Sequence, residues 1–175
     1  MTLQTILFDL DGTLLDSAPG LMTSTNTALA RCGCPPRSLA QITAAMGNGM
    51  ADLIARSLPG GAEDPRFAAC FDAFQEAYQS DMFTGSAPYP GILELLEALG
   101  SRGCRLAVVS NKRDGAVKAL CRQFFGERIA VAIGERPGVS RKPAPDSALT
   151  ALQELGMPAQ TAAYVGDSEV DIATA

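Results

Sequence analysis

The sequence predicts an α/β fold in which a parallel β-sheet is interrupted by an all-helical insertion. Two observations support this prediction. Short apolar runs alternate with helical segments of roughly ten residues, as in strand–helix–strand units with right-handed crossovers. Between residues 16 and 84, by contrast, the pattern is helical throughout. We therefore expect a core formed by residues 1–15 and 85–175, with a separate helical domain at 16–84.

The expected strands of the core are four apolar runs. They are continuous rather than alternating, as in strands buried on both faces of a sheet. These runs span residues 3–10, 104–110, 129–133 and 161–165, and helices are expected at 91–99, 114–125 and 145–155. Ligands bind such sheets beyond the carboxyl ends of the strands, so a site is expected there.

The insertion should contain four helices separated by glycine and proline. They are expected at 17–31, 38–46, 50–58 and 65–81, with Phe67, Phe71 and Phe74 spaced as one buried stripe. Gly47-Asn48-Gly49 breaks the pattern between two of these helices. It is either a simple helix break or a tight loop whose N–H groups meet an anionic substrate. The two interpretations stay open at this stage.

Composition excludes several classes of protein. The net charge of −5 gives no general attraction to nucleic acid or to an anionic membrane. No apolar stretch reaches the ~18 residues of a membrane span, and the N-terminus lacks the features of a signal peptide. The five cysteines form no CxxC pair, which favours reduced thiols and a cytoplasmic protein. The chain should be a monomer or a weak homodimer.

Histidine is absent from the chain. This excludes Ser-His-Asp and Cys-His catalysis and histidine-based zinc sites. Acid–base chemistry must then use carboxylates, lysine, cysteine or tyrosine. Polar groups of these kinds collect at the ends of the predicted strands: Asp9, Asp11, Ser110, Asn111, Lys112, Arg141, Lys142, Asp167 and Asp171.

Three or four carboxylates around one point require a cation. Mg²⁺ prefers oxygen ligands and commonly takes one or two carboxylates together with a substrate phosphate, and Asp9 and Asp167 could supply them. An ionised Asp9 could attack phosphorus and form an aspartyl-phosphate. Asp11 could protonate the leaving oxygen and then activate water. The Ser110 hydroxyl and a lysine could neutralise the phosphoryl oxygens.

Four ordered segments resemble the motifs of the haloacid dehalogenase (HAD) superfamily: DLDGTLLDS (9–17), VVSNK (108–112), RKPAP (141–145) and GDSEVD (166–171). The resemblance implies a Rossmannoid core with a helical C1 cap at 16–84. It implies that Asp9 is the nucleophile, Asp11 the general acid/base, and Ser110 and Lys142 the phosphoryl-binding residues. The Mg²⁺ ligands would be Asp9, Asp167 and the Asp11 backbone carbonyl, supported by Asp171.

The resemblance also bears on the substrate. Dehalogenases proper carry tyrosine where this chain has Asp11, and the mutase branch has a cap-loop arginine near the place of Met50, so the chain resembles a phosphatase. GCPP (33–36), MGNGM (46–50), SNK and KPAPD are most similar to phosphoglycolate phosphatases. We expect a small phosphorylated metabolite as substrate, with 2-phosphoglycolate as the leading candidate. Its binding residues are predicted as Gly12, Thr13, Asn111, Lys112, Gly47, Asn48 and Gly49.

Each assignment has a simpler alternative. Asp9 and Asp11 could be turn acids, Ser110 and Asn111 a helix cap, Asp167 and Ser168 another, and Lys142 a surface lysine. Lys112 and Arg141 could be cations at the rim of the pocket.

Rival functions are a sugar-phosphate, nucleotide or pyrophosphate phosphatase, a phosphomutase, a phospho-accepting signalling domain, and a non-catalytic binding domain. Relatives usually continue beyond residue 175, so the core is expected to be truncated, with 161–165 at a sheet edge.

Overall fold

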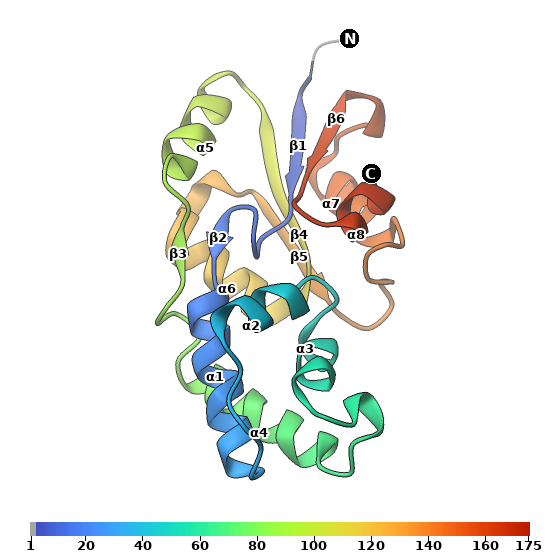
Figure 1. Ribbon diagram of the computed structural model, residues 1–175. Helices are drawn as coiled ribbons and strands as arrows, with labels where there is room; N and C mark the ends of the chain where they lie inside the picture. The colour runs from blue at the N-terminus through green and yellow to red at the C-terminus, as the bar shows by residue number, and fades with distance from the viewer. Residues whose placement is uncertain (1–2) are drawn as a thin grey trace. The chain divides into compact units, whose positions relative to one another are not determined.

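The computed structural model describes residues 3–175, which divide into two compact units (Figure 1). Unit 1 extends to Leu15 and resumes from Ala87 to Ala175, and unit 2 runs from Asp16 to Ser86. The chain returns to unit 1 slightly later than residue 85, where the sequence placed the boundary. Along the described residues, no helix is both long and apolar enough to cross a membrane.

Unit 1 contains a four-stranded parallel sheet, as predicted. Its strands lie in the order β5 (Val131–Glu135), β4 (Arg105–Arg113), β1 (Thr5–Phe8) and β6 (Ala162–Val165). β1 therefore lies between two strands that follow it in sequence, and β6 occupies the expected edge. This reversal of strand order places a ligand-binding position at the carboxyl end of β1.

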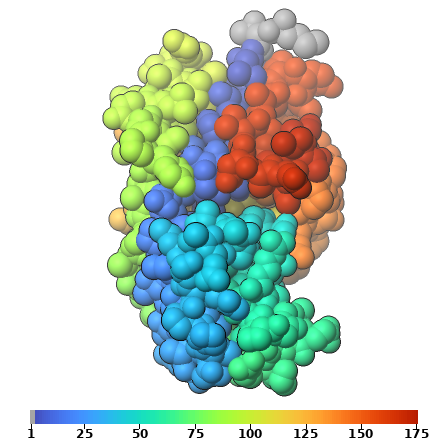
Figure 2. All heavy atoms as spheres, in the orientation of Figure 1, coloured from blue at the N-terminus to red at the C-terminus, as the bar shows by residue number. Residues whose placement is uncertain are grey.

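Side chains of successive residues in these strands point to opposite faces of the sheet. Ile6, Phe8 and Val108 face α5 (Ile92–Ser101) and α6 (Asp114–Phe125), whereas Leu7 and Val109 face α7 (Asp146–Leu155). Both faces of β1 and of the apolar part of β4 are buried, which explains why these two segments do not alternate between apolar and polar residues. The short helix α8 (Glu169–Thr174) follows β6, and Figure 2 shows this red segment at the molecular surface.

Unit 2 is helical, as expected. It contains α1 (Ala18–Arg31), α2 (Leu39–Ala45), α3 (Met50–Ser57) and α4 (Phe67–Ser80), and α1 packs chiefly on α4. Ser38 begins α2 with a reciprocal capping box to Gln41. The predicted aromatic stripe is only partly correct. Phe74 is fully buried, but Phe67 and Phe71 are half-exposed and stack on each other with ring centroids 5.9 Å apart.

Three local features differ from the sequence prediction. β2 (Leu15–Asp16) and β3 (Ala87–Pro88) form an additional two-stranded sheet, which is too short to show a strand periodicity. β4 continues to Arg113 instead of ending at residue 110, although its last residues are polar. Short 3₁₀ helices occur at Gly61–Glu63 (η1), Gly126–Arg128 (η2) and Ala159–Thr161 (η3), where only turns or helix ends were expected.

Candidate active site

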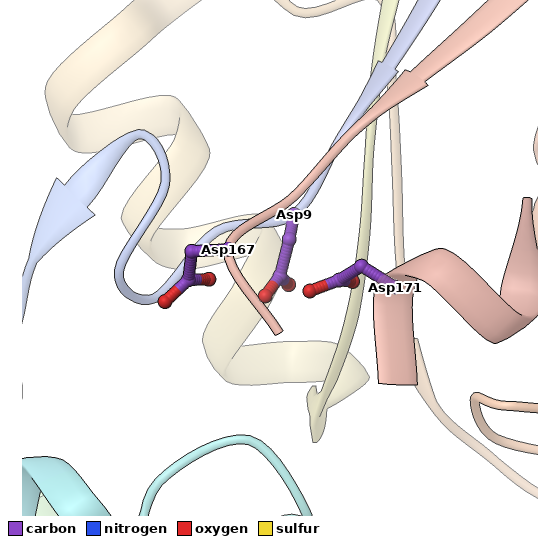
Figure 3. Close-up of side chains that lie close together, drawn as sticks. All are labelled: Asp9, Asp167 and Asp171. Carbon is purple, nitrogen blue, oxygen red and sulfur yellow. The ribbon is translucent and has the colours of Figure 1, made fainter. Parts of the chain in front are cut away.

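Three aspartates meet where β1 and β6 end. The Asp9 N–H donates to the Val165 carbonyl at 2.9 Å, which aligns the ends of the two strands. Figure 3 shows the Asp9 carboxylate lying between those of Asp167 and Asp171. One oxygen from each of the three side chains lies within 4.8 Å of the others. The structure therefore brings together three of the four acids that the sequence predicted as metal ligands.

Lys142 connects two of these acids. Its Nζ lies 2.9 Å from Asp9 Oδ1 and 2.6 Å from Asp171 Oδ1, and the residue is only 3% exposed. Asn111 Nδ2 donates to the Lys142 backbone carbonyl at 3.0 Å and so ties the lysine loop to β4. Lys142 is thus a buried site residue and not a surface lysine. Asn111, predicted to bind substrate, contacts the loop that carries this lysine.

The environment of Asp9 disfavours its charged form. Burial raises the pKa of Asp9 to about 7, against the attraction of Lys142, and the negative charges of Asp171 and Asp11 add to the rise. A carboxylate must be ionised to act as a nucleophile. One lysine shared with Asp171 is therefore too little positive charge to keep Asp9 fully ionised near neutral pH. A further cation at this position would supply the missing charge.

Asp171 is held by several donors. Lys142 Nζ and the Tyr164 hydroxyl contact Oδ1, at 2.6 and 3.2 Å, and the Ser168 N–H and hydroxyl contact Oδ2. Burial alone would raise the pKa of Asp171, but the hydrogen bonds from Lys142 and Ser168 outweigh it and lower the pKa. Ser168 also caps α8 through a reciprocal capping box with Asp171, as the alternative interpretation anticipated.

Asp11 forms a separate ion pair with Lys112. Lys112 Nζ lies 2.8 Å from both oxygens of Asp11, and the lysine is 4% exposed. The expectation that Lys112 is a rim cation is therefore wrong: it is buried against the predicted general acid/base. The backbone N–H of Lys112 donates to Ser110 Oγ at 3.3 Å. Ser110, Asn111 and Lys112 are polar and buried, and each makes a hydrogen bond within the site, as buried polar groups normally do.

Two glycines give these carboxylates room. Gly12 has φ +89°, and a Cβ there would collide with the Asp167 carboxylate. A Cβ on Gly166 would collide with the side chain of Asp171. Thr13 donates its hydroxyl to Asp167 Oδ1 at 3.1 Å. Gly12 and Thr13, predicted to bind substrate, thus lie against the predicted metal ligand Asp167.

The remaining predicted residues belong to unit 2 or to the loop before Lys142. Gly47, Asn48 and Gly49 belong to unit 2, where Gly47 and Gly49 have φ of +104° and +92°. Their role toward a substrate stays a prediction. Arg141 is exposed, with its guanidinium 3.9 Å from Glu135.

The sequence prediction missed the roles of Tyr164, Ser168 and Gly166 around Asp171. The only signal for Tyr164 was a hydroxyl at the end of an otherwise apolar run, which is also common in ordinary strands. Ser168 was recognised only as a possible helix cap, and the close approach of Gly166 to a side chain five residues later has no local signature.

Comparison with known proteins agrees with this arrangement. The family model for haloacid dehalogenase-like hydrolases matches residues 6–175. A phosphoglycolate phosphatase of Rhodospirillum rubrum is 36% identical over 178 residues, covering 97% of this chain and 74% of the relative. A phosphoglycolate phosphatase of Cereibacter sphaeroides is 39% identical, covering 97% and 79% respectively.

Solved structures of related proteins have the same fold. A predicted phosphoglycolate phosphatase from Haemophilus somnus superposes with a TM-score of 0.90 at 29% identity, covering 99% of this chain and 81% of that chain. CbbY from Rhodobacter sphaeroides, in complex with phosphate, gives a TM-score of 0.76 at 28% identity, covering 99% and 81%. The chain therefore belongs to the haloacid dehalogenase-like hydrolase family. Within that family it is a phosphatase similar to the phosphoglycolate phosphatases, as Asp11 and the segments GCPP, MGNGM, SNK and KPAPD predicted.

Proposed function

We propose that the protein hydrolyses 2-phosphoglycolate, or a similarly small phosphorylated carboxylic acid, through a phosphoryl group carried on Asp9. The observation that carries this proposal is the geometry of Asp9. It lies at the carboxyl end of β1, one of its oxygens is held by Lys142, and Asp167 lies beside it. The names of the relatives at 36% and 39% identity support the choice of substrate.

The acids fit a magnesium ion by their chemistry. Asp9 and Asp167 offer hard oxygen ligands, and the raised pKa of Asp9 indicates that its site lacks positive charge. Asp9, Asp167 and the backbone carbonyl of Asp11 would hold the ion. When bound, Mg²⁺ would keep Asp9 ionised and offset the negative charge of the phosphoryl group.

The chain's own residues account for the two chemical steps. An oxygen of Asp9 attacks phosphorus, and the bond from phosphorus to the ester oxygen breaks as Asp11 gives that oxygen a proton. Asp11 then takes a proton from water, whose oxygen attacks phosphorus and releases phosphate from Asp9. Lys142 holds the orientation of Asp9, and the Ser110 hydroxyl binds a phosphoryl oxygen.

Selectivity for a small acid is assigned to residues 46–50 of unit 2. Their small side chains and glycine backbone suit a short anionic group, and the loop contains no lysine or arginine for a second phosphate. Gly47 and Gly49 have positive φ, a conformation that most other residues adopt only with strain. We also propose a cytoplasmic protein that is a monomer or a weak homodimer.

The test is a phosphate-release assay across 2-phosphoglycolate, glucose 6-phosphate, a nucleoside monophosphate and pyrophosphate. We expect the highest kcat/KM for 2-phosphoglycolate, loss of turnover in EDTA, and recovery with Mg²⁺. Higher kcat/KM for any of the other three would overturn the substrate. Full activity in EDTA would overturn the metal role. Stoichiometric phosphorylation without turnover would instead indicate a signalling domain.

A further inference from the structure

Tyr164 is a half-buried polar residue that the mechanism above does not use. It lies in β6, two residues before Gly166. Its hydroxyl lies 3.2 Å from Asp171 Oδ1 and 3.3 Å from the Val109 carbonyl of β4. Lys142 Nζ lies 5.8 Å from the centre of its ring. Tyr164 thus contacts both members of the ion pair that adjoins Asp9.

The single proton of the phenol decides which contact dominates. A tyrosine hydroxyl has one hydrogen to donate, and an ionised carboxylate is a stronger acceptor than a backbone carbonyl. Burial, together with the negative charges of Asp9 and Asp171, raises the pKa of Tyr164 well above its ordinary value. Because the carboxylate is the stronger acceptor, Asp171 is the preferred partner of the hydroxyl.

The donors around Asp171 occupy both of its oxygens. Oδ1 accepts from Lys142 and Tyr164, and Oδ2 accepts twice from Ser168. A carboxylate offers about four lone-pair directions, so these contacts fill them. Asp167 differs, because it is exposed and accepts a hydrogen bond from Thr13. The two acids of the last motif therefore have different surroundings.

We propose that Tyr164 is a positioning residue for Lys142. Together with Ser168 it fixes Asp171 as the counter-ion of Lys142, so that Asp171 orients the lysine toward Asp9 while Asp167 is left to bind the metal. This inference rests on the proposed function, because the orientation of Lys142 matters only if Asp9 carries the phosphoryl group. It replaces the sequence-based prediction that Asp171 supports the metal.

The substitution Tyr164→Phe removes the hydroxyl and keeps the ring beneath Lys142. We expect kcat for phosphate release to fall about tenfold, as for the loss of a hydrogen bond to a charged group, with KM changed less than about twofold. The Kd for Mg²⁺ alone, measured by calorimetry, should also change less than about twofold. Asp167→Asn should raise that Kd at least about tenfold. Tyr78→Phe, at a buried tyrosine of unit 2, is the matched control and should leave kcat unchanged.

The outcomes separate this inference from the proposed function. An unchanged kcat in Tyr164→Phe would overturn the positioning role, and a loss of Mg²⁺ affinity equal to that of Asp167→Asn would show that Asp171 is a metal ligand. A wild-type chain that releases no phosphate would overturn the proposed function instead. In that case, the free energies of unfolding of Tyr164→Phe, Lys142→Met and the double variant still test the contact. Non-additive losses support coupling through Asp171, and additive losses overturn it.

Discussion

The active site contains two lysine–aspartate arrangements that differ in how the lysine is shared. Lys142 forms ion pairs with two acids and contacts one oxygen of Asp9 and one oxygen of Asp171. Lys112 contacts both oxygens of a single acid, Asp11. Both lysine side chains are about 3% exposed or less, but the acids differ: the Asp9 side chain is 8% exposed and that of Asp11 is 17% exposed.

This difference separates the proposed roles of the two acids. Lys142 contacts Oδ1 of Asp9, so the second carboxylate oxygen, Oδ2, is the one that we expect to attack phosphorus. Asp11 is more exposed and is oriented through both oxygens, which suits a group that exchanges protons with a leaving oxygen and with water. Two aspartates two positions apart can therefore serve as nucleophile and proton shuttle because their lysine partners hold them differently.

The largest effect is expected at the nucleophile. Asp9→Asn keeps the size of the side chain but removes the attacking oxygen anion, so phosphate release should fall at least about 10³-fold. The measurement is steady-state kinetics with 2-phosphoglycolate and saturating Mg²⁺. Asp16→Asn, at an acid outside the cluster, is the control and should retain activity. If Asp9→Asn kept more than a few per cent of the wild-type rate, another residue would have to be the nucleophile.

The two lysines can be compared directly by substitution with methionine, which has a similar shape but no charge. Lys142→Met leaves Asp9 and Asp171 without their shared cation, so kcat should fall about 10²-fold. Lys112→Met removes only the partner of the partly exposed Asp11, and a smaller loss of about tenfold is expected. Circular dichroism would establish that both variants fold. A greater loss in Lys112→Met would reverse the comparison.

The raised pKa of Asp9 predicts how stability depends on pH without metal. Because the folded-state pKa is about 7 and the ordinary value is 3.8, the folded protein binds this proton more tightly. The resulting contribution to the free energy of unfolding is fully present below about pH 4 and is lost as pH rises through 7. It is at most about 4 kcal/mol.

Urea unfolding in EDTA at pH 5 and pH 8, with Asp9→Asn as reference, isolates this contribution. Wild type should lose stability relative to the variant as pH rises. Added Mg²⁺ should restore more stability at pH 8 than at pH 5, because it binds the ionised carboxylate. A difference between wild type and variant that does not change with pH would contradict the raised pKa.

A smaller effect is expected at an ion pair outside the site. Asp64 accepts hydrogen bonds from the Arg66 side chain at 2.8 Å and from the Gly60 N–H at 3.1 Å, and the Arg66 contact holds the pKa of Asp64 well below its usual range. The contribution of the ionised Asp64 carboxylate to the free energy of unfolding is fully present above the ordinary pKa of aspartate. It is lost as pH falls through the lower pKa that Asp64 has in the folded protein. Asp64→Asn should lower Tm by a few degrees at pH 7 and leave kcat unchanged.

Thermal unfolding at pH 7 and at acidic pH checks the last expectation. The difference in Tm between wild type and Asp64→Asn should shrink as pH falls. Glu76→Gln, at the exposed pair with Arg31, is the control and should cause almost no change in Tm. A loss of kcat in Asp64→Asn would show that unit 2 influences the chemistry through this pair.

The sequence predicted the sheet, the helices and the acids of the site because each has a local signal. Continuous apolar runs mark buried parallel strands, and Asp9, Asp11 and Asp167 lie at the ends of such runs or within two residues of them. The partners of the acids have no comparable signal. Lys112 meets an acid 101 positions earlier in the chain, and Tyr164 meets a carboxylate fixed by the cap of α8. Such contacts depend on strand order and register, which propensity does not encode.

The central claim is that Asp9 carries the phosphoryl group while Asp11 handles the protons. The most direct measurement uses Asp11→Asn with 2-phosphoglycolate and Mg²⁺, an acid quench, and mass spectrometry of the peptides. Without Asp11 to activate water, the covalent intermediate should break down slowly and accumulate. We predict a mass increase of one phosphoryl group, located on Asp9. Phosphate on a different residue would contradict the account.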